Sequence, residues 1–175
     1  MKDENCIFCK LANGDIPTNT VYEDEEFRVI LDASPATRGH ALILPKQHYA
    51  NLYEIDENVA ADSMKLAKKL AIHMKKVLGC DGVNVLQNNE ETAGQTVFHF
   101  HVHVIPRYQG AKNDDIIQWT HEDFSEDEMK KILDKAFIIV LICVFVVSGY
   151  KIANYFYDAQ VQNGRFEKMA TVVEN

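Results

Sequence analysis

The stretch "GQTVFHFHVHVIPR", residues 94–107, places three histidines at every second position of the chain. His99, His101 and His103 alternate with phenylalanine and valine, and this two-residue period is typical of a β-strand with one buried face. We therefore expect the three imidazoles to point to one side and the apolar side chains to pack on a core. Pro106 has no N–H for a sheet hydrogen bond, so we expect the strand to end there.

Around this stretch the sequence predicts an α+β domain with a mainly antiparallel sheet and one long helix. A pair of short strands joined by an acidic turn is expected over 20–33, and further strands are expected over 40–48 and 82–89. Apolar residues recur at helical spacing over 56–79, and Gly79 is expected to end that helix.

The length and charge limit the kinds of ligand. The chain has 175 residues, enough for one domain with an appendage, and a net charge of −8. No lysine or arginine cluster lies near the histidines, which argues against a nucleic acid as partner, because binding a phosphate backbone needs a basic surface. A single nucleotide is compatible with this charge, since a few N–H groups can hold one phosphate. The N-terminus has no apolar signal segment, and the four cysteines suit a reducing compartment.

A second chemical signal is the C-x2-C pair of Cys6 and Cys9, in residues 1–14 that we expect to form a short turn. Such a pair can supply two of the four ligands of a structural zinc ion, or it can be a pair of free thiols. The sequence contains no second C-x2-C pair, so the other zinc ligands would be histidines. The candidates are His40, His48, His73, His99, His101, His103 and His121.

The pattern H-φ-H-φ-H-φ (φ, apolar) from His99 to Val104 stands beside "CIFCK", "GDIP", "VYED", "LDASPATRGHALILPKQH" and "NNEETAGQTVFHFHVHVIPRY". Together these motifs resemble the histidine-triad (HIT) family, in the branch of the Hint-like nucleotide hydrolases, over residues 4–135. The resemblance implies a HIT-like fold, a purine nucleotide as ligand and a homodimer. It also implies cleavage at the α-phosphate of a nucleoside phosphoramidate or related nucleotide, through a covalent nucleotidyl-histidine intermediate.

The resemblance implies roles for individual residues as well. His101 would be the nucleophile, His103 would touch the phosphate or the leaving group, and His40 would lie behind the nucleophile. Imidazole is largely neutral near pH 7, so this nucleophile needs no strong base. Asp32 would hold the ribose hydroxyls. The phosphate would contact Asn88, Gln95, Thr96 and the backbone around Gly94, and Ile30 and Ala33, which flank Asp32, would form a wall of the base pocket. The expected ligands of a structural zinc ion are Cys6, Cys9, His48 and His99.

The composition changes sharply near residue 136. Residues 136–150 carry no charge, and aromatic residues and lysine flank them. We therefore expect a C-terminal hydrophobic helix over 136–157 that crosses a membrane, following a catalytic domain over 1–135 and preceding a polar tail over 158–175. Lysines before the helix would place the catalytic domain in the cytoplasm. The C-terminal part faintly resembles the membrane anchor of class B sortases, without the catalytic residues of those enzymes.

Three alternatives stay open. The chain could be a membrane-tethered module that binds purine nucleotides with little or no turnover. It could instead be a metal hydrolase in which His99, His101 and His103 hold a zinc ion with an open position. The hydrophobic segment could also be a buried helix or a dimer-interface helix, although it lacks a polar stripe.

Overall fold

The computed structural model describes residues 2–111 and 122–147. The chain divides into two compact units, Met1–Gln118 and Trp119–Asn175, and each is described by itself. The first unit combines a sheet with helices, so the predicted α+β class is confirmed. The domain limits that we predicted after residues 135 and 157 stay predictions.

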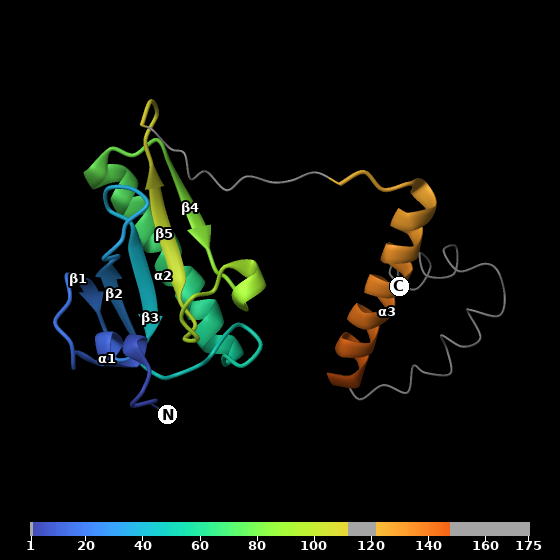
Figure 1. Ribbon diagram of the computed structural model, residues 1–175, viewed down its shortest axis with the longest axis horizontal. Helices are drawn as coiled ribbons and strands as arrows, with labels where there is room; N and C mark the ends of the chain where they lie inside the picture. Colours follow the sequence, from blue (N-terminus) through green and yellow to red (C-terminus); the bar gives the residue numbers. More distant parts are fainter. Residues whose placement is uncertain (1, 112–121, 148–175) are drawn as a thin grey trace, which may run out of the picture. The chain divides into compact units, whose positions relative to one another are not determined.

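The first unit contains a five-stranded antiparallel sheet with the strand order β1-β2-β3-β5-β4 (Figure 1). The strands are β1 (Thr20–Glu23), β2 (Phe27–Leu31), β3 (Ala41–Pro45), β4 (Gly82–Leu86) and β5 (Val102–Arg107). The other elements are α1 (Ile7–Asn13), α2 (Glu57–Leu78) and the 3-10 turn η1 (Glu91–Ala93). The mainly antiparallel sheet and the single long helix are therefore confirmed.

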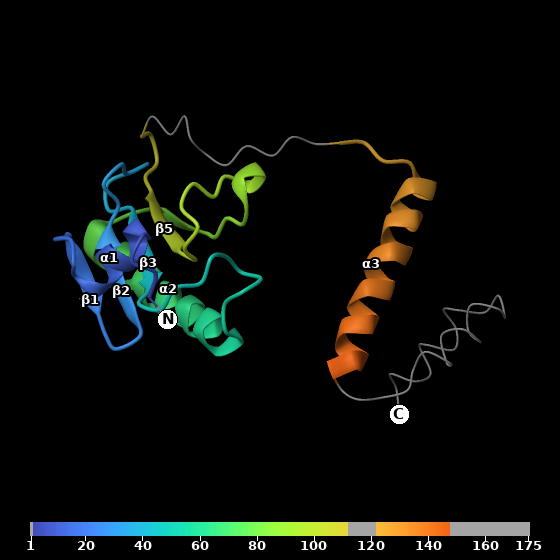
Figure 2. The ribbon, with the colours of Figure 1, turned by 60° about the horizontal axis from the view of Figure 1, so that its bottom comes forward.

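Helices α1 and α2 cover different faces of the sheet, as Figures 1 and 2 show. Alternate residues of a strand point to opposite faces, so β2 and β3 each contribute to two separate apolar clusters. The larger cluster joins α2 to the sheet and includes Phe27, Val29, Ala41, Ile43, Ala67, Leu70, Met74, Val102 and Val104. The smaller cluster joins α1 to the sheet and contains Ala12, Ile30, Leu42 and Leu44, with Phe8 and Leu11 packed against it.

Helix α2 begins and ends close to where its sequence predicts. The Asp56 side chain accepts hydrogen bonds from the backbone N–H groups of Asn58 and Val59, at 2.8 and 3.3 Å. Gly79 caps the other end with φ +67°, a left-handed conformation that favours glycine. One part of the predicted apolar face is wrong, because Met64 is 53% exposed and the smaller Ser63 is buried in its place.

The histidine stretch is a strand only in its second half. β5 begins at Val102, so His99 and His101 precede it and only His103 lies in it. The apolar alternation holds, because Phe100 and Val102 are buried in the larger cluster. The sheet pairing of β5 does not extend to Phe100, because the backbone N–H of Phe100 donates instead to the carbonyl oxygen of Tyr49 at 2.6 Å. The prediction of one continuous strand is therefore wrong. The three imidazoles still gather on one side, because His99 and His101 both contact the Phe8 ring and the ring centroids of His101 and His103 are 4.9 Å apart.

The predicted end of the strand is also wrong. Pro106 lies inside β5, opposite Val83 of β4. The pairing of β5 with β3 reaches only Val104, so the strand has a free edge at the proline, where a missing N–H costs no ladder hydrogen bond. The Pro106 carbonyl oxygen accepts a hydrogen bond from the Thr37 hydroxyl at 2.6 Å.

The N-terminal segment is more ordered than the predicted turn. Residues Ile7–Asn13 form α1, and the Sγ atom of its N-cap residue Cys6 accepts a hydrogen bond from the backbone N–H of Cys9. Gly14 ends the helix at φ +86°. The two cysteines are therefore held at the first turn of a helix that packs on the sheet.

The second unit contains α3 (Glu126–Val147). A capping box starts this helix: the Ser125 hydroxyl donates to Glu128 Oε2 at 2.6 Å, and the Glu128 N–H donates to Ser125 Oγ. Within the described ranges, no helix is long and apolar enough to cross a membrane. The membrane helix predicted over 136–157 thus has no support; its residues 148–157 and the tail over 158–175 lie outside those ranges.

Replacing the N-cap of α2 tests how that helix is stabilised. We expect Asp56→Ala to lower the free energy of unfolding by about 1 kcal/mol, because two N–H groups of the first turn lose their acceptor. Asp56→Ser should retain most of the stability. Denaturant unfolding monitors both, with the exposed neighbour Glu57→Ala as a matched control. Equal stability of Asp56→Ala and Glu57→Ala would contradict this account.

Candidate active site

The first histidine of the triad faces the cysteine pair. His99 Nε2 donates to the carbonyl oxygen of Pro45 at 3.0 Å, and because a carbonyl oxygen only accepts, the ring proton lies on Nε2. The lone pair of His99 is therefore on Nδ1, which lies 3.5 Å from Sγ of both Cys6 and Cys9. His48 joins this group from beyond β3, with its Nδ1 3.4 Å from Cys9 Sγ.

These four side chains have the composition and spacing of a tetrahedral metal site. The ligand atoms of Cys6, Cys9, His48 and His99 all lie within 4.8 Å of one another. For a tetrahedral zinc ion, with bonds of about 2.3 Å to sulfur and about 2.0 Å to nitrogen, the sulfur and nitrogen ligands lie about 3.6 Å apart. The observed separations of 3.4–3.5 Å fit this geometry. The structure thus brings together the set that the resemblance implied.

The middle histidine is fixed by its neighbour's backbone. His101 Nδ1 donates to the carbonyl oxygen of His99 at 2.6 Å, which leaves the lone pair of the ring on Nε2. Phe8 packs edge-on against the imidazole, with ring centroids 5.0 Å apart and an interplanar angle of 86°. His101 is buried, and burial lowers its pKa below the ordinary value. A neutral imidazole with one defined lone pair is a competent nucleophile at neutral pH.

The third histidine takes its tautomer from His40. The backbone N–H of Ala36 donates to His40 Nδ1 at 3.1 Å, so His40 carries its proton on Nε2. This Nε2–H donates to Nδ1 of His103 at 2.9 Å. A neutral His103 then carries its own proton on Nε2 and is a hydrogen-bond donor there. The backbone amide of Ala36 therefore determines which nitrogen carries the proton in His40 and, through His40, in His103.

Burial keeps this pair of rings neutral. Burial is the main cause that lowers the pKa of His40, whereas Asp32, with Oδ2 3.6 Å from His40 Nε2, acts in the opposite direction. Burial, together with the neighbouring His101 and His40, lowers the pKa of His103 to about 4. Near pH 7 the uncharged form of His103 therefore dominates.

Asp32, His40 and His103 also place one ligand atom each within 4.8 Å of the others. An imidazole needs a lone pair on the nitrogen that binds a metal, but His40 Nε2 carries the ring proton. These hydrogen bonds therefore disfavour a metal ion at this group. Within the described ranges, no group of potential metal ligands combines all three triad histidines, which argues against the alternative of a zinc hydrolase built on them.

The predicted phosphate-binding residues lie in the segment 88–96 between β4 and β5. Asn88 Nδ2 is 3.4 Å from the carbonyl oxygen of Gly94, so the two ends of the segment approach each other. Gly94 has φ +86°, which favours glycine, and both Gly94 and Thr96 are exposed. The N–H of Gly94 itself donates to the Glu91 carbonyl oxygen at 2.9 Å, so the exposed Thr96 hydroxyl and the Asn88 amide are the polar groups that this part of the segment offers to an anion.

Gln95 has a different environment from these neighbours. Its side chain is 1% exposed and bonds the protein itself: Nε2 donates to the carbonyl oxygens of Ala50 and Val97, and Oε1 accepts from the N–H of Glu90. In this conformation the buried Gln95 amide stabilises the segment through hydrogen bonds to the protein and does not face solvent. A substrate contact of this side chain stays a prediction.

The predicted base-pocket residues are split between core and surface. Ile30 is buried among Ala12, Leu42 and Leu44, whereas Ala33 is exposed. A wall formed by both residues stays a prediction.

Sequence reasoning missed three residues that shape the site. Phe8 contacts the ring of His101, Ala36 sets the tautomer of His40, and buried Asn51 bonds Glu90 in the segment 88–96. Phe8 had a usable signal, an aromatic residue between two cysteines at helical spacing. The other two act through contacts that no local pattern in the sequence reports.

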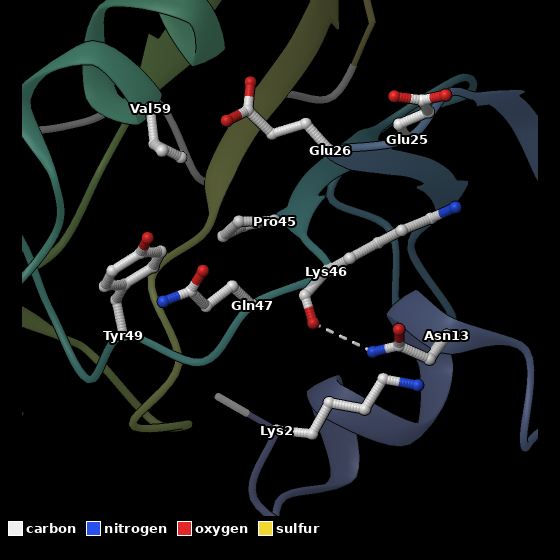
Figure 3. Close-up of a pocket in the computed structure, with 9 residues that line it drawn as sticks. All are labelled: Lys2, Asn13, Glu25, Glu26, Pro45, Lys46, Gln47, Tyr49 and Val59. Carbon is white, nitrogen blue, oxygen red and sulfur yellow. Dashed lines mark hydrogen bonds between the residues drawn. The ribbon is translucent and has the colours of Figure 1, made fainter.

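A pocket of about 460 Å³ lies at the end of β3. Figure 3 shows Lys2, Lys46, Glu25 and Glu26 among its lining residues, and the Asn13 amide donating to the Lys46 carbonyl oxygen at 2.9 Å. None of the nine lining residues is one of the predicted site residues. The predicted chemistry therefore lies outside this pocket.

Comparisons with known proteins agree with the geometry of the site. The sequence model of the HIT domain matches residues 13–110. The chain therefore belongs to the HIT domain family, as the histidine and cysteine motifs predicted.

Two relatives and one solved structure illustrate the similarity. Protein hit of Bacillus subtilis is 42% identical over 130 residues, 74% of this chain and 90% of that protein. Adenosine 5'-monophosphoramidase HNT1 of Saccharomyces cerevisiae is 39% identical over 130 residues, 74% of this chain and 79% of that protein. A Zn-bound histidine triad family protein from Mycobacterium smegmatis has 34% identity and a TM-score of 0.60, covering 75% of this chain and 97% of that one.

The neutral state of His103 predicts a pH dependence of stability. Its pKa is about 4 in the folded protein and about 6.5 in an unfolded chain, so between these values the unfolded chain binds more protons. The free energy of unfolding should therefore fall as the pH drops from 6.5 to 4, by on the order of 2 kcal/mol for this residue. Thermal or denaturant unfolding across this range should show a shallower slope for His103→Gln. An unchanged slope would contradict the assignment, and exposed His73→Gln is the control.

Proposed function

We propose that this protein is a nucleotide hydrolase that cleaves at the α-phosphate of a purine nucleoside phosphoramidate or a related nucleotide, with His101 as nucleophile. The observation that carries the proposal is the 2.6 Å hydrogen bond from His101 Nδ1 to the His99 carbonyl oxygen. This bond leaves Nε2 as the one nitrogen of the ring with a lone pair. The similarity to an adenosine 5'-monophosphoramidase supports the substrate class.

The reaction would proceed in two displacements at phosphorus. His101 Nε2 attacks the α-phosphorus, an N–P bond forms, and the bond from phosphorus to the leaving group breaks. As this bond forms, the ring becomes cationic, and the His99 carbonyl oxygen that accepts from Nδ1 stabilises the charge. Water then attacks the same phosphorus, the N–P bond breaks, and a nucleoside monophosphate is released.

The surrounding residues would orient the substrate and move protons. His103, with its proton on Nε2, donates to a phosphoryl oxygen or to the leaving group, and His40 holds it in that tautomer. Asn88, Gly94 and Thr96 bind the phosphate at the exposed segment 88–96. Asp32 accepts hydrogen bonds from the ribose hydroxyls.

We further propose that Cys6, Cys9, His48 and His99 hold a structural zinc ion. The separations of 3.4–3.5 Å between their ligand atoms support this, as does the similarity to a Zn-bound histidine triad family protein. A zinc ion here would tie α1 to the residue whose carbonyl oxygen orients His101. The homodimer that the resemblance implies stays a prediction.

Replacing the nucleophile separates catalysis from binding. We expect His101→Asn to reduce release of AMP from adenosine 5'-phosphoramidate by about a thousandfold or more, because no covalent intermediate forms. The affinity for AMP should stay within about fivefold of the unchanged protein. Chromatography follows turnover and calorimetry follows binding, with exposed His73→Asn as the matched control. Turnover that survives in His101→Asn would exclude this nucleophile, and binding without turnover in the unchanged protein would indicate a nucleotide-binding module.

Removing one thiolate tests the zinc site. We expect the purified full chain to contain one zinc ion per chain, and Cys9→Ser to reduce this content and lower the midpoint of thermal unfolding. Cys80→Ser is the matched control, because Cys80 is buried in the larger cluster beneath α2. Atomic absorption and thermal unfolding measure the two effects. A protein without zinc whose stability is unchanged by Cys9→Ser argues against the site.

A further inference from the structure

One residue of the segment 88–96 has a backbone conformation that its side chain disfavours. Glu90 has φ 68° and ψ 159°, and it is the one non-glycine residue with positive φ among the described residues. With positive φ and an extended ψ, the Cβ of an L-residue crowds its own backbone, and proteins place glycine almost exclusively in this region. Such a conformation persists only where neighbouring contacts hold it.

The contacts that hold the Glu90 backbone come from residues that follow it in the segment. Its N–H donates to Gln95 Oε1 at 2.9 Å, and its carbonyl oxygen accepts from the N–H groups of Gln95 and Ala93 at 3.0 and 3.1 Å. These bonds close the segment on itself around the buried Gln95 side chain. The direction of the chain at Asn88 and at Gly94 therefore depends on the conformation of Glu90.

The side chain of Glu90 adds a link to the connection between β3 and α2. Asn51 Nδ2 donates to Glu90 Oε1 at 2.9 Å, and Asn51 is 6% exposed, so its amide needs an acceptor within the protein. Two further bonds run beside it: the Leu52 N–H donates to Asn89 Oδ1 at 2.7 Å, and Gln95 Nε2 donates to the Ala50 carbonyl oxygen at 2.7 Å. Three successive residues, 50–52, thereby anchor the segment.

A glycine at position 90 would adopt the same backbone without strain but would leave the Asn51 amide without this acceptor. The carboxylate that accepts from Asn51 therefore explains why a glutamate occupies a position whose backbone conformation favours glycine. We propose that Glu90 is a positioning residue, which fixes the shape of the phosphate-binding segment 88–96 through its bond to Asn51 and contributes no contact to the substrate. This inference rests on the proposed function for the role of the segment.

Three variants of the full-length protein separate the strain from the hydrogen bond. Glu90→Gln keeps an acceptor oxygen for Asn51, Glu90→Ala removes the acceptor and keeps the strain, and Glu90→Gly removes both. The measurements are AMP affinity by calorimetry, the thermal unfolding midpoint, and kcat and KM with adenosine 5'-phosphoramidate. Glu57→Ala, at an exposed glutamate of α2 outside the segment 88–96, is the matched control.

We expect Glu90→Ala to weaken AMP binding and raise KM by about fivefold, the effect of losing one hydrogen bond, with a smaller change in kcat. Glu90→Gln should restore the affinity. Glu90→Gly should unfold at a higher temperature than Glu90→Ala, because the strain is relieved, yet bind AMP no better than Glu90→Ala. The Glu57→Ala control should match the unchanged protein in AMP affinity, kcat and KM.

Two results would overturn the inference: AMP affinity in Glu90→Ala equal to that of the Glu57→Ala control, or an unfolding midpoint of Glu90→Gly no higher than that of Glu90→Ala. If the unchanged protein neither binds AMP nor turns over the phosphoramidate, the proposed function fails. In that case the midpoints still test the strain, and recovery of the Glu90→Ala midpoint in Glu90→Gln still tests the bond to Asn51.

Discussion

The hydrogen bond from His101 Nδ1 to the carbonyl oxygen of His99 is the constraint on which the site depends. It determines which nitrogen of the central imidazole has a lone pair. In the proposed reaction the backbone of His99 therefore orients the nucleophile, while the His99 side chain belongs to the cysteine-histidine group. A metal ion in that group would bind the side chain of His99, and the carbonyl oxygen of the same residue orients His101. The spacing of the motif therefore connects the metal site to the proposed nucleophile.

The sequence was a reliable guide wherever a local pattern determines the structure. Alternation in the histidine stretch correctly placed Phe100 and Val102 in the core, and helical spacing with Gly79 located α2. The same alternation did not reveal that the strand begins only at Val102. A hydrogen bond to Tyr49, which lies 51 positions earlier in the chain, takes the backbone of Phe100 out of the ladder, and the alternation of residue types does not reveal such a partner.

For the candidate site, too, the sequence identified residues that belong to a motif and missed those that act through contacts between distant segments. The four residues of the cysteine-histidine group were all named from the resemblance, and the structure brings them together. Gln95 was named as a phosphate contact, but its amide is buried and bonds the Ala50 carbonyl oxygen. Glu90 and Asn51 were not named at all, because strain and its compensation arise between segments far apart in the sequence.

The most direct test of this account is the tautomeric state of the histidines, which long-range ¹H–¹⁵N correlation spectra report for each ring. At neutral pH, the account predicts that His101 carries its proton on Nδ1 and that His40 and His103 carry theirs on Nε2. A proton on Nε2 of His101, or a rapid average of both tautomers, would contradict it, because the ring would then lack the defined lone pair that the proposed displacement needs.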